Sequence, residues 1–247
     1  MRSFFKPLLT CTAAVLLLAA PAHAQSKALT EDDVVAIVKR VIKEQPELII
    51  DSLESMKARE SANSQQKQAA TLKTSKAALT QNPLSPFIGN PKGDVVVVEF
   101  FDYHCGYCKR MLPVMQELVK SDKNVKVVFK EFPILSEDSG LAARAALAVN
   151  KVAPKKYFEY HGKLMNHKGE FTEESLLKYA DELSIDREAV RKEANAEWIT
   201  KYLGEIRSLA QKLDIQGTPA MIVGDQILPG ATDVDTLKGL IAKARAK

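Results

Sequence analysis

Two cysteines separated by two residues, Cys105 and Cys108, are the side chains of this 247-residue sequence best placed for chemistry. They follow an apolar run from Val95 to Phe101 and precede apolar residues at helical spacing: Met111, Leu112, Met115, Leu118 and Val119. The pattern predicts a strand, the cysteine pair and then a helix. Unpaired N–H groups at a helix start favour the thiolate of the first cysteine. Cys105 is then the attacking nucleophile of thiol–disulfide exchange, and Cys108 is the resolving thiol.

Other uses of a cysteine pair fit this sequence less well. A zinc site needs two more ligands at suitable spacing, and beyond the N-terminal leader only His104, His161 and His167 remain. Attachment of c-type haem requires a histidine after the second cysteine, where Lys109 stands. A structural disulfide that closes so small a loop gains little stability. We expect a redox-active pair, and we treat His161, His167 and Trp198 as structural.

The first 24 residues have the pattern of a secretory signal. Arg2 and Lys6 precede an apolar stretch from Leu8 to Ala20, and Ala22-His23-Ala24 is a small-residue cleavage site. A retained membrane anchor is the alternative, but about 20 apolar residues are needed to span a bilayer. We therefore expect a mature chain that begins near Gln25, without Cys11, in an oxidising compartment.

Composition excludes several classes of protein. An apolar fraction of 46% is too high for a disordered chain, and three cysteines in 247 residues do not make a disulfide-stapled miniprotein. Without residues 1–24, 33 basic side chains face 31 acidic ones, a net charge of +2. Nucleic-acid binding requires a larger basic excess, so we expect no nucleic-acid partner.

Residues 25–56 form the next predicted segment, an N-terminal helical one. Thr30 with Asp33 resembles a helix start, Pro46 suits the first turn of a second helix, and an apolar stripe follows at helical spacing: Val34, Ile37, Val38, Val41, Ile42, Ile49, Leu53 and Met56. The stripe is too narrow for an independent core. We expect residues 30–56 to bury it against copies from other chains as a homo-oligomer. Docking on the chain's own catalytic domain is the alternative.

Residues 57–83 are polar and predict a solvated helix or a linker, and the Asn82-Pro83 pair marks a boundary. Beyond it the pattern predicts these elements: a strand at 125–132, an alanine-rich helix at 141–149, a helix after Thr172, a helix from Asp186 through Trp198 towards Leu213, strands at 219–223 and 226–228, and a helix at 234–242. The order predicts a mixed α/β domain over residues 84–247 with a helical insert at about 136–213.

Glu99 is an acid within the apolar run. Alternation along a strand would put it on one face with Val97 and Phe101. A lone buried carboxylate is costly unless it has a partner or a role, whereas at an exposed strand end it would be ordinary. Lys130, in the second predicted strand, is either a neighbour of Glu99 or a surface lysine.

Residues 100–109 together with Gly217-Thr218-Pro219-Ala220 resemble the DsbA-type branch of the thioredoxin superfamily. The resemblance implies a thioredoxin fold with a helical insert. It also implies that Glu99 accepts a proton from Cys108, and that a cis peptide before Pro219 presents the Thr218 backbone to substrate. Three residues beside the thiols would tune the redox potential: His104, Gly106 and Tyr107. No cofactor is expected beyond the Cys105–Cys108 disulfide.

The helical segment before such a domain resembles the ScsC-like group of oligomeric periplasmic oxidoreductases. We therefore expect a thiol:disulfide oxidoreductase of a Gram-negative periplasm that acts on cysteine-containing exported proteins. Gly106, Tyr107 and Thr218 resemble the isomerase-type members, which favours an isomerase or reductase kept reduced by a membrane partner. A dithiol oxidase that donates disulfides is the alternative. A third possibility is a copper(I)-binding protein, because thiolates suit that soft ion.

Overall fold

A computed structural model describes residues 29–246, so the predicted signal, residues 1–24, lies outside the described part of the chain. The chain divides into two compact units, residues 1–57 and 58–247. Within the described residues, no helix is both long enough and apolar enough to cross a membrane.

The first unit contains helix α1 (Glu31–Glu44) and the beginning of helix α2 (Glu47–Thr80). Thr30 caps α1 through a reciprocal pair of hydrogen bonds with Asp33, which confirms the predicted helix start. The large apolar side chains that these helices carry within the first unit are 37% to 57% exposed in the single chain: Val34, Val35, Ile37, Val38, Val41, Ile42, Leu48, Ile49, Ile50, Leu53 and Met56. The first unit therefore has no core of its own within its described residues.

The rest of α2 belongs to the second unit. Leu72 and Leu79 are buried in the core of that unit. Lys130 Nζ donates to the Ala78 carbonyl at 2.7 Å, and Lys126 Nζ donates to the Thr80 carbonyl at 3.3 Å. Residues 57–83 were expected as a solvated helix or a linker. They are helical to Thr80 and mostly exposed, and the last turns join the second unit through Leu72, Leu79 and the two lysine–carbonyl hydrogen bonds.

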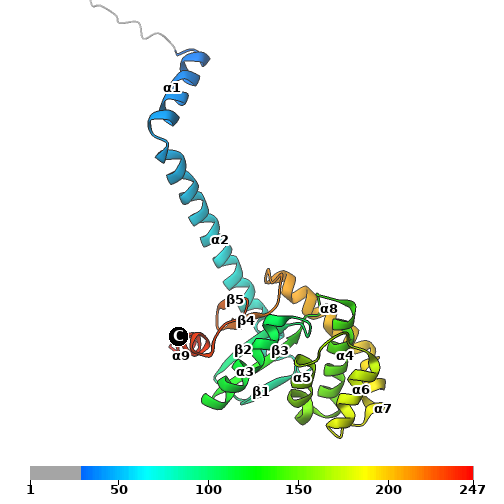
Figure 1. The fold of residues 1–247 in the computed structure, drawn as a ribbon. Coiled ribbons are helices and arrows are strands. Elements are labelled where there is room, and N and C mark those ends of the chain that lie inside the picture. Colours follow the sequence, from blue (N-terminus) through cyan, green and yellow to red (C-terminus); the bar gives the residue numbers. More distant parts are fainter. Residues whose placement is uncertain (1–28, 247) are drawn as a thin grey trace, which may run out of the picture. The chain divides into compact units, whose positions relative to one another are not determined.

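The second unit is built on a five-stranded sheet of order β1-β3-β2-β4-β5 (Figure 1). Its strands are β1 (Phe87–Gly89), β2 (Val95–Phe101), β3 (Val125–Glu131), β4 (Ala220–Val223) and β5 (Gln226–Pro229). The central pair, β2 and β3, is parallel, and the other pairs are antiparallel. Strand β1 was not predicted, since three residues carry almost no periodic signal.

The helices are α3 (Gly106–Ser121), α4 (Glu137–Val152), the 3₁₀ turn η1 (Pro154–Lys156), α5 (Tyr157–Met165), α6 (Glu173–Glu182), α7 (Arg187–Ala194), α8 (Glu197–Lys212) and α9 (Val234–Arg245). Turn η1 and helix α5 were not predicted. The single helix expected from Asp186 to Leu213 was wrong, because the chain becomes extended at Ala196 and divides it into α7 and α8. Elements α4 to α8 form the helical insert between β3 and β4.

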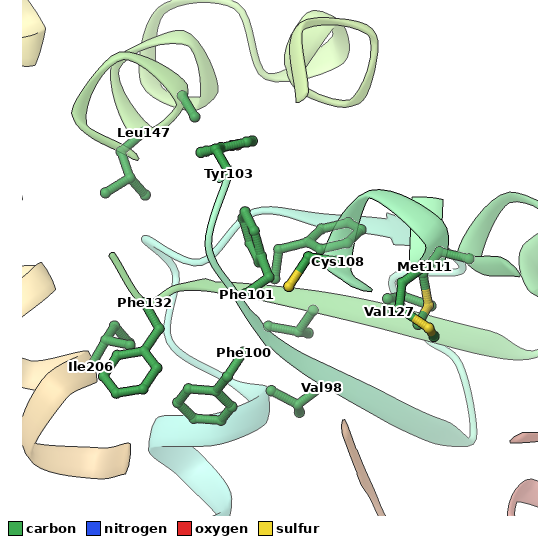
Figure 2. Close-up of a cluster of buried hydrophobic side chains, with 14 of the residues drawn as sticks. Val98, Phe100, Phe101, Tyr103, Cys108, Met111, Val127, Phe132, Leu147 and Ile206 are labelled. Carbon is green, nitrogen blue, oxygen red and sulfur yellow. The ribbon is translucent and has the colours of Figure 1, made fainter. Parts of the chain in front are cut away.

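Alternation along β2 divides the core between the two faces of the sheet (Figure 2). Phe100 lies on the face that carries Phe132 and Ile206 of α8, while Phe101 lies on the face that carries Cys108 of α3. All these side chains are at most 6% exposed. Phe101 of the central strand therefore lies on the same face of the sheet as Cys108 in the first turn of α3.

Candidate redox site

Cys105 is the N-cap of α3 and Cys108 lies in its first turn. The Cys108 backbone N–H has no partner within the helix, and it donates to Cys105 Sγ at 3.4 Å. Both cysteines are free thiols here, with Cys105 6% and Cys108 0% exposed. Burial raises the pKa of the Cys108 thiol far above its usual range. Cys105 thus keeps a little exposed surface, whereas Cys108 is enclosed and stays protonated, which suits a nucleophile and a resolving thiol.

The loop before β4 lies against the first sulfur. The Thr218–Pro219 peptide bond is cis, which confirms the expectation from the resemblance. Cys105 Sγ donates to the Thr218 carbonyl at 3.2 Å, although the two residues are 113 positions apart in the chain. Thr218 Oγ1 is buried and has no hydrogen-bond partner among the described residues. The predicted substrate-binding residues therefore adjoin the predicted nucleophile.

Glu99 is 2% exposed, so the alternative in which it lies at an exposed strand end was wrong. Burial raises the pKa of Glu99 to about 8, and its Oε1 has no hydrogen-bond partner among the described residues. Its negative charge is one of the smaller contributions, after burial, to the raised pKa of Cys108. Glu99 therefore has the environment of a group that exchanges a proton near neutral pH.

Lys130 fits neither of its expected roles. It pairs in register with Phe100, whereas Glu99 pairs with Phe129, so the two side chains lie on opposite faces of the sheet. Lys130 is fully buried, and its Nζ donates to Ser85 Oγ at 2.6 Å as well as to the Ala78 carbonyl. Lys130 thus has a structural role, because it joins β3 to the end of α2.

Asp102 is the residue of this site that the sequence left without a role. It is 1% exposed, and its Oδ1 accepts from His104 N at 2.8 Å and Ser139 Oγ at 2.7 Å. Its Oδ2 accepts from the Ile134 and Leu135 backbone N–H groups at 2.8 and 3.0 Å. One carboxyl group therefore ties the catalytic turn to the start of the insert. The sequence signal that could have identified Asp102 is its position as an acidic residue directly after a buried strand.

His104 points towards the insert. Its Nε2 and Asp138 Oδ2 are 2.6 Å apart, and its ring lies 4.9 Å from the Phe171 ring. Hydrogen bonds from Ser136, Phe171 and His104 hold the pKa of Asp138 well below its usual range. A carboxylate there accepts the hydrogen on Nε2, which fixes the ring orientation beside Cys105.

The two residues between the cysteines are open to solvent. Tyr107 is 58% exposed, and the Arg110 guanidinium lies 4.2 Å from the centre of its ring. A Cβ atom at Gly106 would meet no atom within 4 Å. Both residues are available for contact with another polypeptide.

The histidines and the tryptophan treated as structural have partners within the insert and the core. His161 is buried with its Nδ1 3.1 Å from Tyr103 Oη, and burial lowers its pKa to about 3. His167 Nδ1 lies 2.9 Å from Tyr179 Oη, and Trp198 Nε1 donates to Glu193. Among the described residues, no group of three or more His, Cys, Asp or Glu side chains is arranged to hold a metal ion.

A family model described as the DSBA-like thioredoxin domain matches residues 96–242, which include the cysteine pair, the insert and the cis-proline loop. The chain belongs to this family. The match begins inside β2 and ends inside α9, so it spans the second unit from its central strand to its last helix.

Solved structures extend the likeness. A thioredoxin-like oxidoreductase from Silicibacter pomeroyi is 40% identical, with a TM-score of 0.65 over 69% of this chain and 98% of that one. A linker-deletion mutant of ScsC from Proteus mirabilis is 31% identical, with a TM-score of 0.67 over 91% of this chain and 99% of that one. The ScsC match thus reaches beyond the thioredoxin domain towards the N-terminal helices.

Curated relatives differ in length. Disulfide bond formation protein D of Bacillus subtilis is 28% identical over 170 residues, which are 64% of this chain and 76% of that protein. The chain spans about a quarter, 24%, of the Na(+)/H(+) antiporter NhaA 1 of Salinispora arenicola. The stretch that resembles this chain therefore makes up most of the one relative and about a quarter of the other.

Proposed function

We propose that this protein is a thiol:disulfide oxidoreductase that acts on cysteine-containing exported proteins through Cys105 and Cys108. The observation that carries the proposal is the placement of Cys105 Sγ, which caps a helix, receives the Cys108 N–H and lies 3.2 Å from the Thr218 carbonyl. A client cysteine that reaches this sulfur also reaches the cis-proline loop. Family membership and the name of the Bacillus relative support the same chemistry.

The proposed cycle uses Cys105, Cys108 and Glu99 in turn. The Cys105 thiolate attacks one sulfur of a client disulfide, a mixed disulfide forms, and the other client sulfur leaves as a thiolate. Cys108 then gives its proton to Glu99 and attacks Cys105 Sγ. The Cys105–Cys108 disulfide forms, and the second client sulfur leaves as a thiolate that takes up a proton. The client is reduced by two electrons, and the reverse sequence oxidises a client dithiol.

Within this chemistry we favour isomerase or reductase activity over donation of disulfides. Gly106, Tyr107 and Thr218 support this choice through their resemblance to isomerase-type members of the superfamily. The exposed apolar side chains of residues 30–56 support assembly into a homo-oligomer, which would bring several thiols to one misfolded client. A membrane redox partner would keep the pair reduced. The periplasmic location of a Gram-negative cell rests on the predicted signal, and the likeness to a periplasmic thioredoxin-like protein from Salmonella enterica, 31% identical, supports it.

Two measurements on the same preparation test the proposal. Equilibration with reduced and oxidised glutathione gives the potential of the Cys105–Cys108 pair, and refolding of a scrambled disulfide protein gives isomerase activity. We expect catalysed refolding that disappears in Cys105→Ser. A potential near the oxidant end, with dithiol oxidation but no reshuffling, would favour the oxidase instead. Tight copper(I) binding by the reduced chain, with no turnover of either kind, would contradict the enzymatic proposal.

A further inference from the structure

A second buried carboxyl group lies beside the end of β2, and the proposed cycle does not use it. Glu131, the last residue of β3, is 1% exposed and pairs in register with Phe101, the last residue of β2. Paired residues of neighbouring strands point to the same face of a sheet, so Glu131 lies on the face that carries Phe101 and Cys108. Its neighbour Lys130 points to the opposite face, where α2 and Ser85 bind its ammonium group. Glu131 therefore forms no ion pair with the lysine beside it.

A chain of hydrogen-bonding side chains leads from this acid to the catalytic turn. Tyr157 Oη of α5 donates to Glu131 Oε1 at 3.0 Å, and the Tyr157 hydroxyl is also a hydrogen-bond partner of the Tyr103 hydroxyl. Tyr103 Oη lies 3.1 Å from His161 Nδ1. Figure 2 shows Tyr103 in the turn that follows β2, and it precedes Cys105 by two residues. The chain thus runs from the end of β3, through α5, to the turn that carries the nucleophile.

This chain is enclosed by aromatic rings. All four of its members are 1% exposed. The Phe101 ring meets the rings of Tyr103 and His161 edge to face, both at 5.0 Å, and the Phe129 ring lies 4.9 Å from the His161 ring. Glu131 Oε2 is buried without a hydrogen-bond partner among the described residues. In such surroundings a donor or acceptor that loses its partner is costly, so a change at one end of the chain affects the other.

Within the chain, Glu131 is the group that changes charge near neutral pH. Burial raises its pKa to about 7, although the hydrogen bond from Tyr157 and the positive charge of Lys130 lower it. Burial also raises the pKa of the two tyrosines well above their usual range and lowers the pKa of His161 to about 3, so these groups stay neutral. The titratable groups in and around the chain come from the turn, two strands and two helices: Glu99 of β2, Tyr103 of the turn, Lys130 and Glu131 of β3, Tyr157 and His161 of α5, and Tyr202 of α8.

The charge of Glu131 sets the direction of the chain, because each tyrosine has a single hydroxyl hydrogen. When Glu131 is ionised, Tyr157 donates to it. Tyr103 then has one hydrogen for two acceptors, Tyr157 Oη and His161 Nδ1. When Glu131 carries a proton, it donates to Tyr157, which leaves the Tyr157 hydrogen for Tyr103. The Tyr103 hydrogen then goes to His161 alone, so only the protonated form satisfies every link.

From this geometry we infer that Glu131 is a positioning residue of the thiol–disulfide reaction, and that its gain or loss of a proton reaches the catalytic turn through Tyr157 and Tyr103. The protonated chain holds Tyr103, and with it the turn before Cys105, in one arrangement. The ionised chain holds the turn less firmly. The inference rests on the proposed function and adds a residue, outside the cysteine pair and Glu99, through which pH acts on the reaction.

Glu131→Gln in the full mature chain tests the inference, because glutamine has the shape of protonated glutamate, keeps a donor for Tyr157 and cannot ionise. The measurement is the rate at which Cys105 of the reduced protein reacts with oxidised glutathione, followed by stopped flow across pH. Dividing the rate of the variant by that of the unmodified chain cancels the ionisation of Cys105 itself. We expect a ratio near one at about pH 5.5 that rises about threefold by about pH 8.5, the effect of one ordinary hydrogen bond.

Two tyrosines of α5 provide a second variant and its matched control. Tyr157→Phe should give the same rising ratio, because Tyr103 then has His161 as its single acceptor at every pH, and Glu131→Gln should add nothing to it. Tyr160 is equally buried, but its hydroxyl donates to the Leu176 carbonyl at 3.0 Å, outside the chain. The ratio for Tyr160→Phe should therefore stay constant across pH.

The ¹⁵N shifts of the His161 ring report on the chain without catalysis. The Nδ1 signal should move between about pH 5.5 and about pH 8.5 in the unmodified chain and stay fixed in Glu131→Gln. A signal that moves equally in both, or a rate ratio that is constant for both Glu131→Gln and Tyr157→Phe, would overturn the inference. A cysteine pair that does not react with glutathione at any pH would contradict the proposed function as well, whereas a reactive pair with constant ratios contradicts only the role of Glu131.

Discussion

At the scale of single residues, the two cysteines of this site are chemically unequal. Cys105 receives an N–H group at a helix start and is partly accessible, whereas Cys108 is enclosed. Burial holds the pKa of Cys108 far above its ordinary range, so that thiol stays protonated in the reduced protein. The order of reaction between the two sulfurs follows from these surroundings.

Alkylation of the reduced protein should therefore be selective. At neutral pH iodoacetamide should modify Cys105 at least ten times faster than Cys108, because Cys108 is fully enclosed and its thiol stays protonated. Peptide mapping after timed quenching measures both rates. Cys105→Ser should abolish the fast reaction and Cys108→Ala should preserve it. A fast reaction that survives in Cys105→Ser would reverse the assigned roles.

Glu99 should impose a pH dependence on the second half of the cycle. With its pKa raised to about 8, the fraction of Glu99 able to take a proton from Cys108 grows as pH rises towards 8. Resolution of a mixed disulfide should accelerate over that range in the unmodified chain and lose this dependence in Glu99→Gln. Stopped-flow release of a labelled peptide measures the rate. The same pH–rate profile in the unmodified chain and in Glu99→Gln would contradict a role of Glu99 in proton transfer.

The same group should affect stability. Its pKa is raised on folding, so the unfolded chain gives up the proton first, and stability falls as pH rises from about 4.5 to 8. Glu99→Gln should therefore raise the free energy of unfolding at pH 8 by roughly 3–5 kcal/mol and change it little at pH 4. Denaturant unfolding at the two pH values tests the sign.

At the scale of elements, the first turn of α3 depends on the start of α4. Asp102 and the pair formed by His104 and Asp138 join the catalytic turn to residues 134–139. These contacts cross the boundary between the thioredoxin core and the helical insert. The insert thus helps to position the nucleophile as well as covering the sheet.

Asp102→Ala should be strongly destabilising, by about 3 kcal/mol, because it removes a buried carboxyl group that accepts from the Ile134 and Leu135 N–H groups and from the buried Ser139 hydroxyl. Asp122→Ala is the matched control. That residue pairs at the surface with Arg245, and its loss should cost no more than about 1 kcal/mol. Comparable losses in the two variants would contradict the positioning role of Asp102.

Elements with a strong local signal were predictable, and those set by distant contacts were not. The Thr30 cap, the β2 run and the start of α3 all follow from neighbouring residues. The direction of Lys130 depends on the register between β2 and β3, which no local pattern carries. The break at Asn195-Ala196 has neither glycine nor proline to mark it. Three of the four groups that donate to Asp102 lie more than 30 positions away.

At the scale of the whole molecule, the catalytic unit begins at residue 58 and not at the Asn82-Pro83 boundary that the sequence indicates. A truncation that removes only the N-terminal helical segment should therefore begin at residue 58. A chain beginning at residue 82 would lose Leu72, Leu79 and the Ala78 carbonyl bound by Lys130, all of which belong to the second unit. A chain beginning at residue 58 keeps them. We predict that the shorter chain unfolds at a clearly lower denaturant concentration than the longer one.

The chain beginning at residue 58 also tests the proposed homo-oligomer. It lacks the exposed stripe on α1 and the start of α2, so light scattering should show a monomer, whereas the mature chain should be an oligomer. The truncated monomer should keep dithiol oxidation and lose most reshuffling of a scrambled substrate. A monomeric mature chain would contradict the assembly, and undiminished reshuffling by the truncated chain would separate assembly from activity.

The claim on which all of this depends is that Cys105 and Cys108 form one redox couple. The most direct test is a titration of the full mature chain across ratios of reduced to oxidised glutathione. Each sample is quenched by alkylation and its mass is measured by intact-protein mass spectrometry. We expect a single two-electron transition in which both cysteines become protected together as the Cys105–Cys108 disulfide. Cysteines that remain alkylatable throughout, or that accumulate separate glutathione adducts, would contradict it.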